Sequence, residues 1–166
     1  MRTLLILLFV SFNGFSQTYD DIMSINSLDS FKKVVIENGY ELVDYKAVFE
    51  MMGTEMTDSI KMKLDDVVMY SKGNIIAGRT FTYEKSTGKF SLTYPFGGGL
   101  MSLFTDNEVN IYEKITKEIK SKCNYQKTVE NNGRDYVTYS CPESSYKGKI
   151  GIATINNIGF LVHIID

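Results

Sequence analysis

Two stretches of the chain space their apolar residues as an amphipathic helix does. The first is predicted over about 27–38, with Ser27 as its N-cap and Gly39 just past its C-terminal end. Its buried face is predicted to be Leu28, Phe31 and Val35. The second is predicted over about 106–122 and opens with a capping box of Thr105 and Glu108. Its buried stripe is predicted to be Ile111, Ile115 and Ile119.

Between and after these helices the apolar period changes to two, which indicates strands. The predicted strands are Leu42–Glu50, Ile60–Leu64, Val67–Ser71, Ile75–Glu84, Lys89–Tyr94, Asn124–Glu130, Arg134–Ser140, Lys149–Ile155 and Gly159–Ile165. Short turns rich in Gly and Asn separate many of them, and hairpin spacing implies antiparallel pairing. We therefore predict an α+β fold with antiparallel β-meanders and two α-helices. A helix precedes each meander, over about 41–94 and about 124–165, in a single compact domain.

The two halves share a short pattern. A shift of 84 residues places Phe31 on Ile115 and Val35 on Ile119. This favours an internal duplication, although two similar halves also arise without one.

The N-terminus predicts export. Arg2 gives a positive start, an unbroken apolar run covers 4–10, and Gly14 and Ser16 stand at the spacing that a signal peptidase reads. The run is far shorter than the roughly 20 apolar residues of a spanning helix. We expect residues 1–16 to be a cleaved signal peptide and residues 17–166 to form one domain. The mature chain then has no integral membrane segment and is secreted or periplasmic, and its composition is typical of a bacterial protein.

The charge pattern argues against nucleic acid and anionic membrane surfaces as partners. The chain carries a net charge of −2, and its basic residues are interleaved with acidic ones. No basic patch of the kind that nucleic acid or an anionic membrane surface attracts is present in the sequence.

The only two cysteines are predicted to form a structural disulfide. If residues 131–133 are a three-residue hairpin loop, Glu130 faces Arg134 and Cys123 faces Cys141. An exported protein with an even cysteine count fits this pairing. The sequence has no CxxC motif, and one histidine with two cysteines is too few for a zinc site, so we expect neither a redox role nor a metal.

The segment that leads into the second helix is the preferred place for a ligand. Three glycines stand there among large apolar residues, without the GK[ST] ending of a phosphate loop. One interpretation is a bent crossover that completes the core. The other is a mobile flap over an apolar pocket, hinged at the glycines. The predicted ligand-binding residues are Tyr94, Phe96, Gly97, Gly98, Gly99, Leu100 and Met101.

The last predicted hairpin, 149–165, is apolar on both faces. An antiparallel strand normally leaves one face to water. We expect helices to cover both faces, with a cavity or a partner as the alternatives. Gly151 and Ala153 would allow a close approach on the second face.

Candidate chemistry is sparse. His163 is the only histidine, and Asp166 would point away from it on a strand, so we interpret it as a core residue with local hydrogen bonds. The methionines Met51, Met52, Met56 and Met62 could bind copper, but we interpret them as adaptable core filler. We predict no catalytic residue and no cofactor.

Three functions remain open. The favoured one is a non-catalytic exported module that binds an apolar small molecule or a protein partner. The second is a structural or inhibitory partner of a cell-envelope protein. The third is a hydrolase whose catalytic carboxylates are scattered along the sequence.

Overall fold

The computed structural model describes residues 17–51, 53–73, 78–96 and 106–165. Within these ranges the chain forms five helices and eight strands. The helices are α1 (Tyr19–Met23), α2 (Leu28–Glu37), α3 (Tyr45–Met51), α4 (Asp58–Asp66) and α5 (Asp106–Lys122). The strands are β1 (Glu41–Leu42), β2 (Val67–Lys72), β3 (Arg79–Glu84), β4 (Phe90–Pro95), β5 (Asn124–Asn131), β6 (Arg134–Ser140), β7 (Lys149–Ile155) and β8 (Ile158–Ile164).

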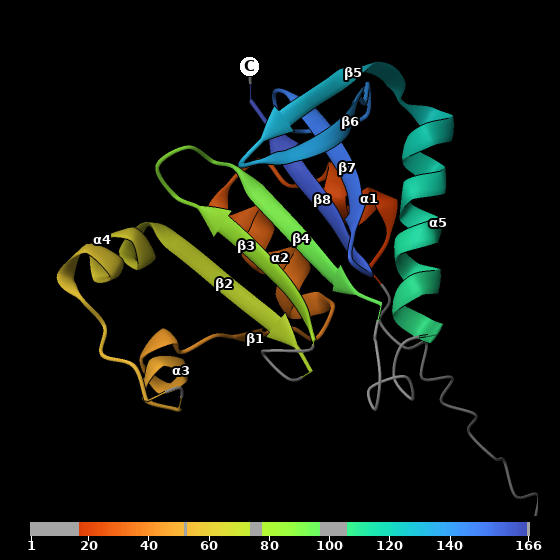
Figure 1. Ribbon diagram of the computed structural model, residues 1–166. Coiled ribbons are helices and arrows are strands. Elements are labelled where there is room, and N and C mark those ends of the chain that lie inside the picture. The colour runs from red at the N-terminus through yellow and green to blue at the C-terminus, as the bar shows by residue number, and fades with distance from the viewer. Residues whose placement is uncertain (1–16, 52, 74–77, 97–105, 166) are drawn as a thin grey trace, which may run out of the picture.

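All eight strands join in one antiparallel sheet, in the order β1-β2-β3-β4-β8-β7-β6-β5 (Figure 1). The two meanders meet where β4 pairs with β8, with Leu92 opposite Leu161. The predicted α+β fold with antiparallel meanders in a single compact domain is confirmed.

Helices α1, α2 and α5 pack on one face of the sheet and close the main core. Alternate strand residues such as Phe81, Leu92 and Leu161 point into this core and are almost fully buried. From α2, Phe31 meets the ring of Phe81 edge-on, with ring centroids 4.9 Å apart. The sequence pattern therefore places both predicted helices correctly, and α2 keeps Ser27 as its N-cap.

Gly159 of β8 shows how closely α5 approaches the sheet. A Cβ atom at this position would lie 2.7 Å from Tyr112 of α5 and 2.5 Å from Phe96. Real side chains do not tolerate such contacts, so only glycine allows this packing. The Tyr112 hydroxyl also donates to the carbonyl oxygen of Ala153, at 2.8 Å.

Two predicted strands are wrong. Residues 45–50 of the predicted strand Leu42–Glu50 lie in α3, and the predicted strand Ile60–Leu64 lies inside α4. Asp44 begins α3, because its Oδ1 accepts hydrogen bonds from the backbone of Lys46 and Ala47 at 2.9 and 3.3 Å. A capped helical turn satisfies these amides locally, and this outweighs the weak period-two pattern. Helix α1 was not predicted.

The β5–β6 hairpin differs from its predicted register near the turn. Its loop has two residues, Asn132 and Gly133, both at positive φ, so Asn131 faces Arg134 and Glu130 faces Asp135. This geometry is that of the two-residue turns that suit right-twisted strands. A register shift between Tyr125 and Thr128 then restores the predicted alignment toward the cysteines.

Candidate functional site

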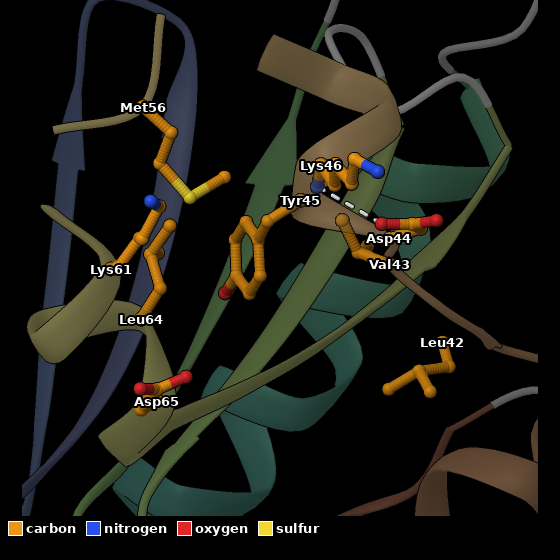
Figure 2. A pocket seen from close by; sticks show the side chains of 9 residues that line it. All are labelled: Leu42, Val43, Asp44, Tyr45, Lys46, Met56, Lys61, Leu64 and Asp65. Atoms are coloured by element: carbon orange, nitrogen blue, oxygen red, sulfur yellow. Dashed lines mark hydrogen bonds between the residues drawn. The ribbon is translucent and has the colours of Figure 1, made fainter. Parts of the chain in front are cut away.

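A hollow of about 450 Å³ opens between α3, α4 and the end of β1 (Figure 2). We call it the α3–α4 hollow. Its lining residues are Leu42, Val43, Asp44, Tyr45, Lys46, Met56, Lys61, Leu64 and Asp65. Its volume lies within the roughly 300–1,000 Å³ typical of small-molecule sites.

Hydrogen bonds to the sheet position the two walls of the hollow, one before α3 and the other at the end of α4. On one side, Val43 donates its amide to the carbonyl oxygen of Met69 in β2, at 2.9 Å. On the other, Lys85 donates its amide to the Asp66 carbonyl oxygen at 2.8 Å, and Ser86 donates its amide to the Asp66 carboxylate at 2.9 Å. The edge of the sheet and the β3–β4 turn therefore hold the two walls apart.

Tyr45 is the most unusual side chain of the hollow. Its ring points from α3 toward Leu64 and Asp65 of α4 (Figure 2). Its hydroxyl is buried and, among the residues that the structure describes, has no hydrogen-bond partner. Burial raises the pKa of this hydroxyl, so it stays protonated. A buried polar group without a partner costs roughly 1–3 kcal/mol, and such a group calls for an explanation.

The hollow combines apolar walls with a balanced set of charges. Leu42, Val43, Met56 and Leu64 supply the apolar surface. Two aspartates and two lysines complete the lining, so their formal charges cancel. Both lysines already have acidic neighbours on their own helices, Lys46 with Glu50 at 3.8 Å and Lys61 with Asp58 at 3.3 Å. The electrostatics of the hollow therefore favour an uncharged molecule.

The site predicted from the sequence lies elsewhere. Tyr94 is fully buried in β4, and its hydroxyl donates to Oε1 of Gln17 at 2.8 Å. Phe96 packs against Tyr112, with ring centroids 5.1 Å apart. Both side chains thus belong to the core beneath α5. The remaining predicted residues, Gly97, Gly98, Gly99, Leu100 and Met101, lie outside the described residues, as does the Thr105 cap.

The two cysteines form the predicted disulfide, Cys123–Cys141. Both are buried, and the bond joins the C-terminal end of α5 to the end of β6. The Tyr19 hydroxyl lies 3.6 Å from the Cys123 sulfur. The bond therefore sits inside the core and serves the fold.

His163 also lies in the core, where it stacks on Phe90 with ring centroids 4.9 Å apart. Its Nε2 lies 2.6 Å from the carbonyl oxygen of Lys147. Since a carbonyl can only accept, Nε2 carries the proton. Burial lowers the pKa of His163, and backbone hydrogen bonds at Lys147 and Gly88 oppose this in part. The neutral ring fastens the segment before β7 to β8.

The second face of the β7–β8 hairpin is covered differently from the first. Among the described residues, the cluster on this face comes from neighbouring strands alone: Tyr136 of β6 packs beside Ala153 and Phe160. A Cβ atom on Gly151 would lie 3.0 Å from Cβ of Tyr136, so this side chain fills the space next to the glycine. No described helix contributes to this cluster, so the prediction that helices cover both faces of the hairpin is wrong for the described residues.

The four methionines that were considered as copper ligands or core filler lie in different places. Met56 lines the hollow, and Met62 is exposed on the far side of α4. Met51 ends α3, and Met52 lies outside the described residues. Met56, interpreted from the sequence as core filler, instead lines the hollow. Tyr45 and Leu64 were missed because strands had been predicted at both positions.

Comparison with known proteins found no family model, no curated protein and no solved structure that matches this chain. Within the described ranges, none of the helices is both long and apolar enough to cross a membrane. Across the same residues, no three side chains of His, Cys, Asp or Glu gather closely enough to hold a metal ion.

Proposed function

We propose that this protein is an exported, non-catalytic module that binds a small, mostly apolar molecule in the α3–α4 hollow. The observation that carries the proposal is the Tyr45 hydroxyl, which is buried beside the hollow and has no partner in the described part of the chain. A ligand that reaches this hydroxyl would remove the cost of its unmet hydrogen bond. The N-terminal export pattern and the disulfide support the exported part.

The lining suggests the chemistry of the ligand. An apolar body would lie against Leu42, Met56 and Leu64. One hydrogen-bonding group would meet the Tyr45 hydroxyl, which can both donate and accept. The balanced charges of the lining favour a neutral molecule over an anion or a cation.

The same lining argues against catalysis. It holds no serine, cysteine or histidine that could act as a nucleophile or as its base. One carboxylate, that of Asp44, is occupied as the cap of α3. Binding is therefore the simplest use of the hollow.

Native mass spectrometry of the protein purified from an exporting bacterial host tests the proposal. We expect a small-molecule adduct on the wild type that is absent from Leu64→Asp, because this change puts a charge on an apolar wall. Met62→Asp is the matched control, since Met62 stands on the same helix at 70% exposure and does not line the hollow. It should retain the adduct.

A titration with N-phenyl-1-naphthylamine, an uncharged apolar fluorophore with one N–H group, gives a second measurement. We expect saturable binding that Tyr45→Phe weakens by up to about tenfold, the equivalent of one hydrogen bond. No adduct together with no dye binding would contradict the proposal. That result would favour the alternative role as a partner of an envelope protein. Equal losses in Leu64→Asp and Met62→Asp would show that binding occurs elsewhere.

A further inference from the structure

Gln17 is buried although it stands at the start of the described chain. The residue is only 2% exposed. Its Oε1 accepts two hydrogen bonds, from the hydroxyls of Tyr40 at 2.9 Å and Tyr94 at 2.8 Å. Its Nε2 is buried and has no partner within the described ranges. The protein therefore uses only the carbonyl half of this amide.

The sequence predicts signal cleavage between Ser16 and Gln17, which would make Gln17 the N-terminal residue. We propose that Gln17 is a modification site, where the new N-terminus closes into pyroglutamate. The α-amino nitrogen attacks Cδ, and an N–Cδ bond forms as the Cδ–Nε2 bond breaks. Nε2 leaves as ammonia with a proton from the amine. The atoms balance without an oxidant or another reactant.

The product lacks the one polar side-chain atom of Gln17 that has no partner in the described chain. Cyclisation expels Nε2, the buried atom that has no partner, and retains the carbonyl oxygen that both tyrosine hydroxyls contact. It also converts the α-amine to a neutral lactam.

The charge of the uncyclised terminus would be poorly placed. A free amine would be an ammonium beside a buried side chain, where desolvation penalises charge. The nearest acidic residues along the chain are Asp20, which is exposed, and Asp21, whose Oδ2 already accepts from the backbone and hydroxyl of Thr18, at 2.8 and 2.9 Å. The lactam removes the need for a counter-ion.

This inference rests on the exported part of the proposed function and is independent of the α3–α4 hollow. The test is the intact mass of the full chain after export from a bacterial host, before any digestion. We expect a chain that starts at residue 17 and is lighter than the glutamine form by one ammonia, besides the disulfide. A chain that starts at Gln17 with a free amine overturns the cyclisation. A different first residue overturns the cleavage as well.

Gln17→Asn is the matched variant, because its shorter side chain cannot close a five-membered lactam. After export, its mature chain should show no loss of ammonia. If this variant fails to fold, a pyroglutamyl peptidase still tests the wild type. Because Gln17 is buried, the enzyme should remove the residue at least about tenfold more slowly from the folded protein than from the unfolded one. Equal rates would contradict the buried placement of the lactam.

Discussion

Helices α5 and α4 both have a solvent-exposed side, but their other sides differ. The inner stripe of α5, Ile111, Ile115 and Ile119, is buried against the sheet and α1. Helix α4 has no buried side chain at all, and polar bonds to the β3–β4 turn anchor its C-terminal end. Apolar burial therefore stabilises the first helix, whereas the second depends on a few hydrogen bonds and on its neighbour α3.

This difference indicates a division of labour. The layer of α1, α2 and α5 supplies the free energy of folding. The α3–α4 pair is free to hold a hollow and an unpartnered hydroxyl, because little of the fold depends on it. Regions of low local stability are where binding surfaces are commonly found.

The largest expected effect is on the helical layer. Phe31→Ala should lower the free energy of unfolding by about 3–5 kcal/mol, because Phe31 is fully buried among the rings of Tyr70, Phe81 and Tyr83. The matched change Phe49→Ala, in the half-buried α3, should cost less than about 2 kcal/mol. Urea unfolding of both variants measures the contrast. Equal losses would remove the distinction between the two regions.

The disulfide comes next. The double variant Cys123→Ala/Cys141→Ala should lose about 3 kcal/mol of unfolding free energy, since the bond closes a loop over a sequence separation of 18. The loss belongs to the helical layer, so dye binding at the hollow should be unchanged in conditions where the variant is folded. Denaturant titration and the dye titration together check this. Weaker dye binding in the folded variant would show that the two regions are coupled.

Stability should also fall in mild acid through His163. The folded protein holds this ring neutral because burial lowers its pKa, whereas the unfolded chain titrates near 6.5. Unfolding then takes up a proton, so the contribution is complete above pH 6.5 and is lost as the pH falls through that value toward the lower folded pKa. Thermal melts across this range measure the slope. In His163→Gln, the melting temperature should fall less between high pH and mild acid than it does in the wild type. An unchanged pH dependence would assign the loss of stability to the carboxylates.

The smallest expected effect has the opposite sign. Tyr45→Phe should leave the ligand-free protein equally stable or more stable by about 1 kcal/mol, because it removes a buried hydroxyl without a partner. The same variant should bind the dye more weakly. Melting temperatures with and without dye separate the two effects. A clear loss of stability without ligand would mean that the hydroxyl already has a partner in the free protein.

The sequence pattern predicted the helical layer well and the hollow poorly, for one physical reason. Ile111, Ile115 and Ile119 repeat every fourth position because they face a core, and burial leaves this period in the sequence. In α4, Ile60, Met62 and Leu64 alternate like a strand, yet Met62 is exposed and nothing buries the other two fully. In a helix that buries no face, the spacing of apolar residues does not reveal the helical period.

The N-cap of α3 could have corrected the strand that was predicted over this helix. Asp44 stands before a run that includes Lys46 and Ala47, and its carboxylate accepts from both backbones. Reading Asp44 as a helix start would have placed Tyr45 on the first turn of α3. It would not have brought Tyr45 near Leu64, because only the tertiary arrangement of α3 and α4 does so.

The register of the β5–β6 hairpin teaches a related point. The predicted loop was one residue too long, and the observed shift between Tyr125 and Thr128 compensates for it. The predicted disulfide was therefore correct, although the predicted pair of Glu130 with Arg134 near the turn was wrong.

The pairing of β4 with β8 also governs when the protein can fold. Strand β8 is made after every other described strand, yet it lies between β4 and β7 inside the sheet. A ribosome must therefore finish residue 164 before the two meanders can join, and contacts of such long separation form slowly. Until then β4 lacks its neighbour β8, so an edge that is internal in the finished sheet stays unpaired through nearly all of the synthesis.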